Sequence, residues 1–194
     1  MPRVQPIDED ALVITRDNLE SAQRRAADIL SQAGLSVRPD EIERMEVADF
    51  GLNELELSGA QILTLVDTDK IAVKLLVMLP DQTEPEHRHP ALGDYAGKEE
   101  TIRCEWGELY LYAPGDPAPN PKGHPPEHRH HTYTVWHEYV LRPGDQITLQ
   151  PNTPHWFQAG PEGSVIWSFS TKAIDVQDVF TDPDIRRVPV IRNE

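Results

Sequence analysis

From about Glu46 onward, the chain is a series of short apolar runs rich in β-branched residues, and turn residues separate them. Most of its 18 prolines lie from Pro80 onward, where they interrupt any long helix. Short β-rich runs at this spacing, with Gly and Pro between them, predict an all-β sandwich or small barrel. The expected strands are 62–66, 71–78, 103–112, 132–141, 146–149 and 164–169.

The first 45 residues follow a different pattern. Residues 19–30 carry apolar side chains at helical spacing, with capping side chains in 15–18 and a natural stop at Gly34. Residues 40–45 predict a second short turn or helix. A length of 194 residues fits one domain. We therefore expect a short N-terminal helical segment (1–45) packed on a barrel (46–194).

Composition narrows the classes of partner. A net charge of −15 argues against nucleic acid and anionic membranes, which both require clustered Lys and Arg. No apolar run approaches the length of a membrane span, and the first ten residues lack the apolar stretch of a signal peptide. Cys104 is the sole cysteine, so no internal disulfide forms, and we expect it to pack in the interior. These features predict a cytoplasmic protein with a small neutral ligand.

One histidine pair indicates a metal site. Because alternate residues of a strand share a face, His87 and His89 would point toward the same place. A carboxylate and a third imidazole from neighbouring strands would complete the ligand set, and Glu100 and His155 are the candidates. We prefer Glu100 to Glu99 because it lies seven residues before Gly107. Such a mixed set suits Mn, Fe, Co, Ni or Zn and leaves positions for two substrate oxygens.

A second cluster resembles the first. Pro126-Glu-His128-Arg-His130 repeats the order of Pro85-Glu-His87-Arg-His89, with His124 and His131 nearby. It follows a proline-rich stretch (114–126) that lacks the N–H donors of a strand and predicts either a surface loop or a lid. We interpret the second cluster as loop and strand-entry histidines, with metal binding as the alternative.

These residues together resemble the cupin superfamily. The resemblance rests on His87-x-His89, on Glu100 followed by six residues and Gly107, and on Pro151-Asn-Thr-Pro-His155. The ten residues between His89 and Glu100 exceed the usual cupin gap, and Asn-Thr-Pro stands where many cupins have glycine. Both departures resemble the cupin-type D-lyxose isomerases. So do segments spread over about 60–190: 86–90, 97–101, 103–112, 154–163 and 180–183.

That resemblance implies a single jelly-roll-like β-barrel that binds a divalent metal, commonly Mn²⁺, with Co, Ni, Zn or Fe as alternatives. It implies interconversion of D-lyxose and D-xylulose, often with D-mannose and D-fructose as further substrates. The superfamily and the N-terminal helical segment together imply a homodimer.

The residues themselves suit aldose–ketose isomerisation, in which a nearby side chain moves a proton between adjacent carbons. The candidates are Lys98, Asp182 and Glu138. Lys98 would share the face of Glu100, with a solvated rim position as its alternative. Asp182 resembles an acidic position of related isomerases, with a turn before proline as its alternative. A hydride shift without a protein base, an iron-dependent dioxygenase and a non-catalytic sugar-binding cupin remain open.

Overall fold

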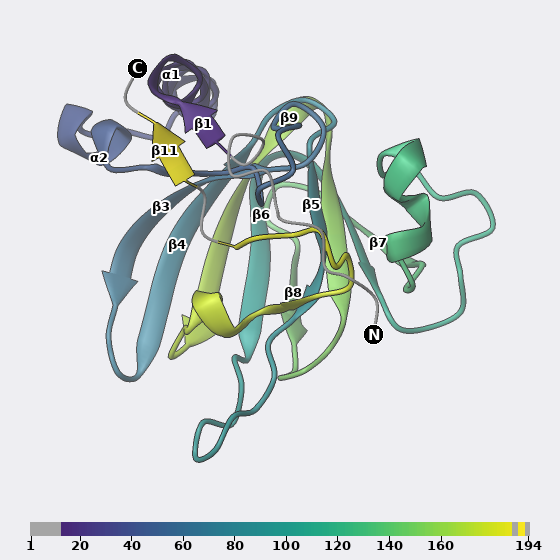
Figure 1. Ribbon diagram of the computed structural model, residues 1–194. Helices are drawn as coiled ribbons and strands as arrows, with labels where there is room; N and C mark the ends of the chain where they lie inside the picture. The colour runs from purple at the N-terminus through teal and green to yellow at the C-terminus, as the bar shows by residue number, and fades with distance from the viewer. Residues whose placement is uncertain (1–12, 188–189, 193–194) are drawn as a thin grey trace, which may run out of the picture.

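The centre of the molecule is a nine-stranded sheet curled into an open barrel (Figure 1). The computed structural model describes residues 13–187 and 190–192. The strands are β2 (Glu46–Ala48), β3 (Ala60–Asp67), β4 (Ile71–Met78), β5 (Thr83–Arg88), β6 (Glu100–Ala113), β7 (His137–Leu141), β8 (Gln146–Leu149), β9 (His155–Thr171) and β10 (Val179–Phe180). The all-β class is confirmed.

Strand β9 organises the sheet, because it pairs antiparallel with three others. Its whole length runs beside β6, while β4 and β5 pair along its other edge. Its two ends both contribute to the main hydrophobic core, through Phe157 and Ile166, and irregularities in the β6–β9 pairing lie between these two residues. Strand β5 therefore lies directly beside the start of β9, and the two strands place their inward side chains together.

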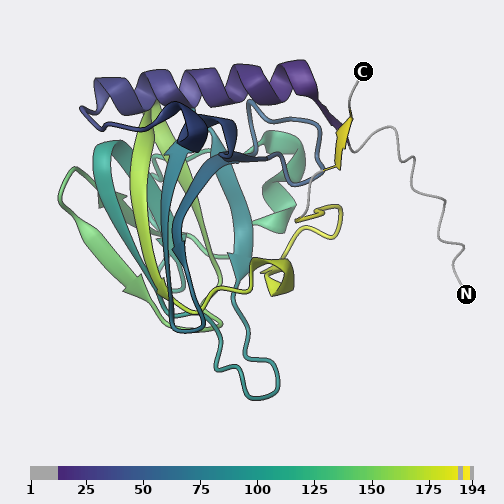
Figure 2. The same cartoon turned by 90° about the vertical axis from the view of Figure 1, so that its left-hand side faces the viewer.

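The predicted N-terminal helix is present. Helix α1 (Arg16–Gln32) begins after Thr15, whose hydroxyl accepts a hydrogen bond from the backbone N–H of Asn18, and α2 (Pro39–Glu43) follows. The buried stripe of α1 packs on the outer faces of β3, β4 and β9, and α1 lies along one end of the barrel (Figure 2).

Strand β1 (Val13–Thr15) pairs in parallel with β11 (Val190–Arg192). No helix in the described ranges is long and apolar enough to cross a membrane. The boundary at residue 45 stays a prediction.

The expected strand over 132–141 is shorter in the structure. A 3-10 helix, η2 (Glu127–Thr132), occupies its start, and β7 begins only at His137. Aromatic packing on the outer face explains the difference, because Trp136 and Tyr133 both pack edge-on against the ring of Trp156. The stretch 114–126 also lies on this outer face, where the N–H of Gly123 donates to the hydroxyl of Tyr112. It is a surface loop and does not cover the barrel interior.

After β9 the chain returns across the barrel as an extended segment, residues 172–187, which we call the C-terminal strap. It contains η3 (Asp175–Gln177) and β10, and it crosses in front of the strands in Figure 1. Strand β10 pairs with β5, with Phe180 opposite His87. The strap thus encloses the interior where the histidines lie.

Candidate metal centre

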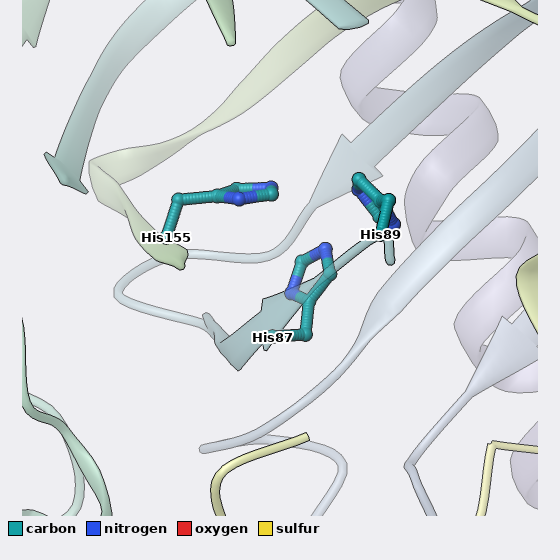
Figure 3. A group of neighbouring side chains, drawn as sticks. All are labelled: His87, His89 and His155. Atoms are coloured by element: carbon teal, nitrogen blue, oxygen red, sulfur yellow. The ribbon is translucent and has the colours of Figure 1, made fainter. Parts of the chain in front are cut away.

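Three buried imidazoles converge at one point inside the barrel. His87 lies opposite His155 in the β5–β9 pairing, and His89 follows the end of β5. One ring nitrogen from each lies within 4.8 Å of the other two. Figure 3 shows the three rings turned toward one another. The structure therefore brings together the three histidines selected from the sequence.

Backbone carbonyls orient two of the rings. The Nδ1–H of His87 donates to the carbonyl of Pro85 at 2.8 Å, and that of His155 donates to the carbonyl of Thr153 at 2.9 Å. Burial lowers the pKa of His155 to about 4 and holds that of His87 well below its usual value, so both rings are neutral. Each then presents the lone pair of Nε2. In the described part of the chain, Nε2 of His155 has no hydrogen-bond partner.

His89 lies between two carboxylates. Its Nδ1 is 2.6 Å from Oδ1 of Asp178 on the strap, and its Nε2 is 3.1 Å from Oε2 of Glu100. Burial alone would lower the pKa of His89, but hydrogen bonds to these two carboxylates raise it. The Asp178 contact fixes the ring orientation and leaves Nε2 directed at Glu100. An outer carboxylate of this kind commonly orients a metal-binding histidine.

Glu100 is the inward-facing member of its pair. It is buried, and it accepts hydrogen bonds from Lys98 at 3.2 Å and from the hydroxyl of Ser168, whereas Glu99 is exposed and accepts from Gln150. Burial raises the pKa of Glu100, but Lys98 and His89 outweigh it and hold the pKa well below its usual range. The carboxylate is therefore charged. Glu100, and not Glu99, faces the interior, as predicted. Its role as a metal ligand stays a prediction.

A cavity of about 30 Å³ adjoins His87 and carries a dense set of charges. Its acidic lining groups are Glu84, Glu100, Asp175 and Asp178, and its basic ones are Lys74, Lys98 and Arg187. Lys74 forms an ion pair with Asp175, which also lies 3.6 Å from Arg187 and 3.9 Å from Lys98. Burial would lower the pKa of Lys98, but Glu100, Asp178 and Asp175 raise it, so the ammonium stays charged.

Five charged residues that line this cavity were not predicted as site residues from the sequence: Lys74, Glu84, Asp175, Asp178 and Arg187. One signal for Lys74 was present, since it is the one charged residue in the otherwise apolar run 71–78. The strap residues have no comparable signal, because their partners are distant in sequence.

Two of the three catalytic candidates lie elsewhere. Asp182 accepts hydrogen bonds from Arg129 at 2.8 Å and from the N–H of Asp184, so it forms both an ion pair and a turn. Glu138 lies on the outer face, where it accepts from the hydroxyl of Tyr112. Neither residue is among those that line the cavity. Of the three, only Lys98 lies beside Glu100, and the catalytic roles of Asp182 and Glu138 stay predictions.

The second histidine cluster is not a metal centre in this arrangement. His128 is exposed and pairs with Glu54 at 2.9 Å, while the ring of His130 stacks on Trp136. Among the described residues, the one group that brings three potential ligand atoms together is His87, His89 and His155.

The residues at this centre fit a divalent metal ion. Two neutral imidazoles present free lone pairs, and one of these is a buried nitrogen without a partner. Nε2 of His89 and Oε2 of Glu100 lie 3.1 Å apart, close enough for both atoms to bind one ion. Three nitrogens and one carboxylate oxygen suit first-row divalent metals.

The chain has close relatives of named activity. It is 49% identical to a D-lyxose ketol-isomerase of Thermofilum sp. (strain ex4484_79), over 92% of this chain and 99% of the relative. It is 45% identical to a D-lyxose/D-mannose isomerase of Thermosediminibacter oceani, over 93% of this chain and all of the relative. No family model matches the chain.

Solved structures show the same fold. The L-ribose isomerase of Cellulomonas parahominis superposes with a TM-score of 0.77 at 16% identity, over 94% of this chain and all of that one. The L-ribose isomerase of Acinetobacter sp. DL28, in complex with L-ribose, gives 0.76 at 15% identity, over 93% and 99%. At these identities the structures establish only the fold, and they confirm the cupin barrel predicted from the sequence. The sequence identity to the relatives establishes more: the chain belongs to the D-lyxose ketol-isomerase family of sugar isomerases.

Proposed function

We propose that the chain is a metal-dependent aldose–ketose isomerase that interconverts D-lyxose and D-xylulose, and also D-mannose and D-fructose. The observation that carries the proposal is the convergence of three buried imidazoles beside a charged carboxylate and a buried ammonium. The named relatives act on D-lyxose and D-mannose, which supports these substrates.

In this proposal His87, His89, His155 and Glu100 hold the metal. A bound divalent ion would supply a positive charge that stabilises negative charge developing on the sugar oxygens. Lys98 contributes a second positive charge, since its ammonium is buried and lies 3.2 Å from Glu100. It polarises the carbonyl of the open-chain aldose. Mn²⁺ is the proposed metal because the resemblance to the cupin-type D-lyxose isomerases implies it; the mixed nitrogen and oxygen donors accept it together with Fe, Co, Ni and Zn.

Chelation and reconstitution test the function. The stripped protein is expected to lose ketose formation, and separate addition of Mn, Co, Ni, Zn or Fe is expected to restore it, Mn most fully. The assay measures ketose formed from a panel of pentoses and hexoses, including D-lyxose and D-mannose. Absence of conversion with every metal and every aldose would overturn the proposal and leave a sugar-binding cupin. A requirement for oxygen would instead indicate a dioxygenase.

Replacing Asp178 with Asn should weaken metal binding without removing it. The amide loses the charge that holds the Nδ1–H of His89, so the ring is less firmly oriented. Outer groups of this kind contribute about 10-fold to 100-fold in metal affinity. Titration of the stripped variant with Mn²⁺ measures the shift. Asp184→Asn is the matched control, because Asp184 lies on the same strap but contacts Arg129. Equal affinities for the two variants would contradict the orienting role.

We also propose a cytoplasmic homodimer. The buried free Cys104 supports a reducing compartment. On the outer sheet face beyond α1, Ile71 is 50% exposed and Phe169 41%, an arrangement that suits burial against a second copy. Mass measurement in solution, for the parent and for Phe169→Glu, tests the dimer.

A further inference from the structure

We propose that Glu84 is the carboxylate that carries the proton between C2 and C1 of the sugar. The assignment rests on the isomerase function proposed above and names a residue that touches the substrate.

Glu84 lies in the right place for this role. It belongs to β5, three residues before His87, and pairs with the core residue Phe157 of β9, so its side chain enters the barrel. It lines the cavity beside His87, and its Oε1 lies 4.0 Å from Nε2 of His87. That separation exceeds hydrogen-bond distance, so Glu84 adjoins the metal centre without being held by it.

Glu84 is also free to accept a proton. It is 8% exposed, and its Oε2 has no hydrogen-bond partner within residues 13–187. A buried carboxyl oxygen without a partner is costly, and such groups in native structures usually have a functional reason.

The other acidic groups of the cavity are already engaged. Glu100 accepts from Lys98 and Ser168, and Asp178 accepts from His89. Asp175 is paired with Lys74 and lies close to Arg187. Among the four carboxyl groups that line the cavity, Glu84 is the one with a fully buried oxygen that has no hydrogen-bond partner in the described part of the chain. Lys98 is unsuited to accept a proton, since its ammonium is paired with Glu100.

The proton transfers balance with one carboxylate. The carboxylate removes the proton from C2 of the open-chain aldose, the C2–H electron pair forms the C1–C2 double bond, and the carbonyl π pair moves to O1. A proton then passes from O2 to O1. As the C2–O2 double bond forms, the electron pair of the C1–C2 double bond takes the proton back from the carboxyl group at C1. The ketose results, and the carboxylate is regenerated.

Glu84→Gln tests the assignment. The amide has nearly the same shape but accepts no proton from carbon, so kcat for D-lyxose is expected to fall about 100-fold to 10,000-fold with KM within about threefold. Metal content is expected to equal that of the parent, and the unfolding temperature to be equal or higher, because a buried unpaired charge is removed. In the parent, solvent deuterium enters C1 of the ketose whenever the protonated Glu84 exchanges with water before it returns the proton, and its appearance there rules out a pure hydride shift. Glu84→Asp, which withdraws the carboxylate by one carbon, keeps part of the activity that Glu84→Gln loses.

Glu99→Gln is the matched control, since Glu99 is exposed on the outer side, and its kcat is expected to stay at the parent value. Two outcomes would reject Glu84 alone: a kcat for Glu84→Gln within threefold of the parent, or loss of metal from that variant. Absence of conversion by the metal-loaded parent with any aldose would reject the isomerase function and the role of Glu84 together.

Discussion

His87→Gln is expected to remove bound divalent metal and to lower isomerase activity by about a thousandfold or more. A thousandfold loss corresponds to about 4 kcal/mol of transition-state stabilisation, and loss of a metal that stabilises an oxyanion is worth several kcal/mol. His87 is critical because it lies within 4.8 Å of both other imidazoles and its Nε2 is free. Metal content per chain and kcat for D-lyxose, measured on the same preparation, provide the test.

The chain contains its own control for this variant. His128 lies in a second Pro-Glu-His-Arg-His sequence, but its side chain is 56% exposed and pairs with Glu54. His128→Gln is therefore expected to keep the metal and to keep kcat within about twofold. An equal loss of metal in both variants would show that the position of His87 in the barrel is not what selects it as a ligand.

These two histidine pairs show what the sequence determines and what it leaves open. The local sequence is the same in both, so spacing alone cannot rank them. The first pair lies at the end of β5, which runs beside β9 in the barrel, and this context distinguishes it. The second lies on η2, where His130 packs on Trp136. The preference for His87 and His89 rested on the downstream Glu100 and His155, which the fold indeed brings close.

The missed residues have a common physical cause. Lys74 meets Asp175 across 101 residues of sequence, and His89 meets Asp178 across 89. Periodicity and spacing report on residues that are near one another in sequence, whereas the strap contacts residues about a hundred positions earlier in the chain. Asp182 shows the converse: it is close in sequence to strap residues that line the cavity, but its carboxylate pairs with Arg129.

Gly107→Ala is expected to destabilise the fold by about 3 kcal/mol or more, as the sum of a backbone term and a steric term. Gly107 has φ of +76°, where residues with a Cβ are strained by about 1–2 kcal/mol. An added Cβ would also lie only 2.2 Å from the carbonyl oxygen of Gly163, so backbone would have to move. A cost of this size corresponds to a fall of roughly 10 °C in unfolding temperature for a chain of this length.

Gly34→Ala separates the two terms, because Gly34 has φ of +73° but no atom lies within 4 Å of the added carbon. It is expected to cost about 1 kcal/mol, the backbone term alone. Thermal and denaturant unfolding gives the loss of unfolding free energy for each variant. The difference between the two losses is the steric cost of the close approach of β6 to Gly163. Equal costs would mean that β6 shifts readily at this point. A larger loss of stability for Gly107→Ala would give a physical reason for the glycine seven residues after Glu100. The chain has a bulge at Gly107, and this bulge permits the β6–β9 pairing that places Glu100 beside His89.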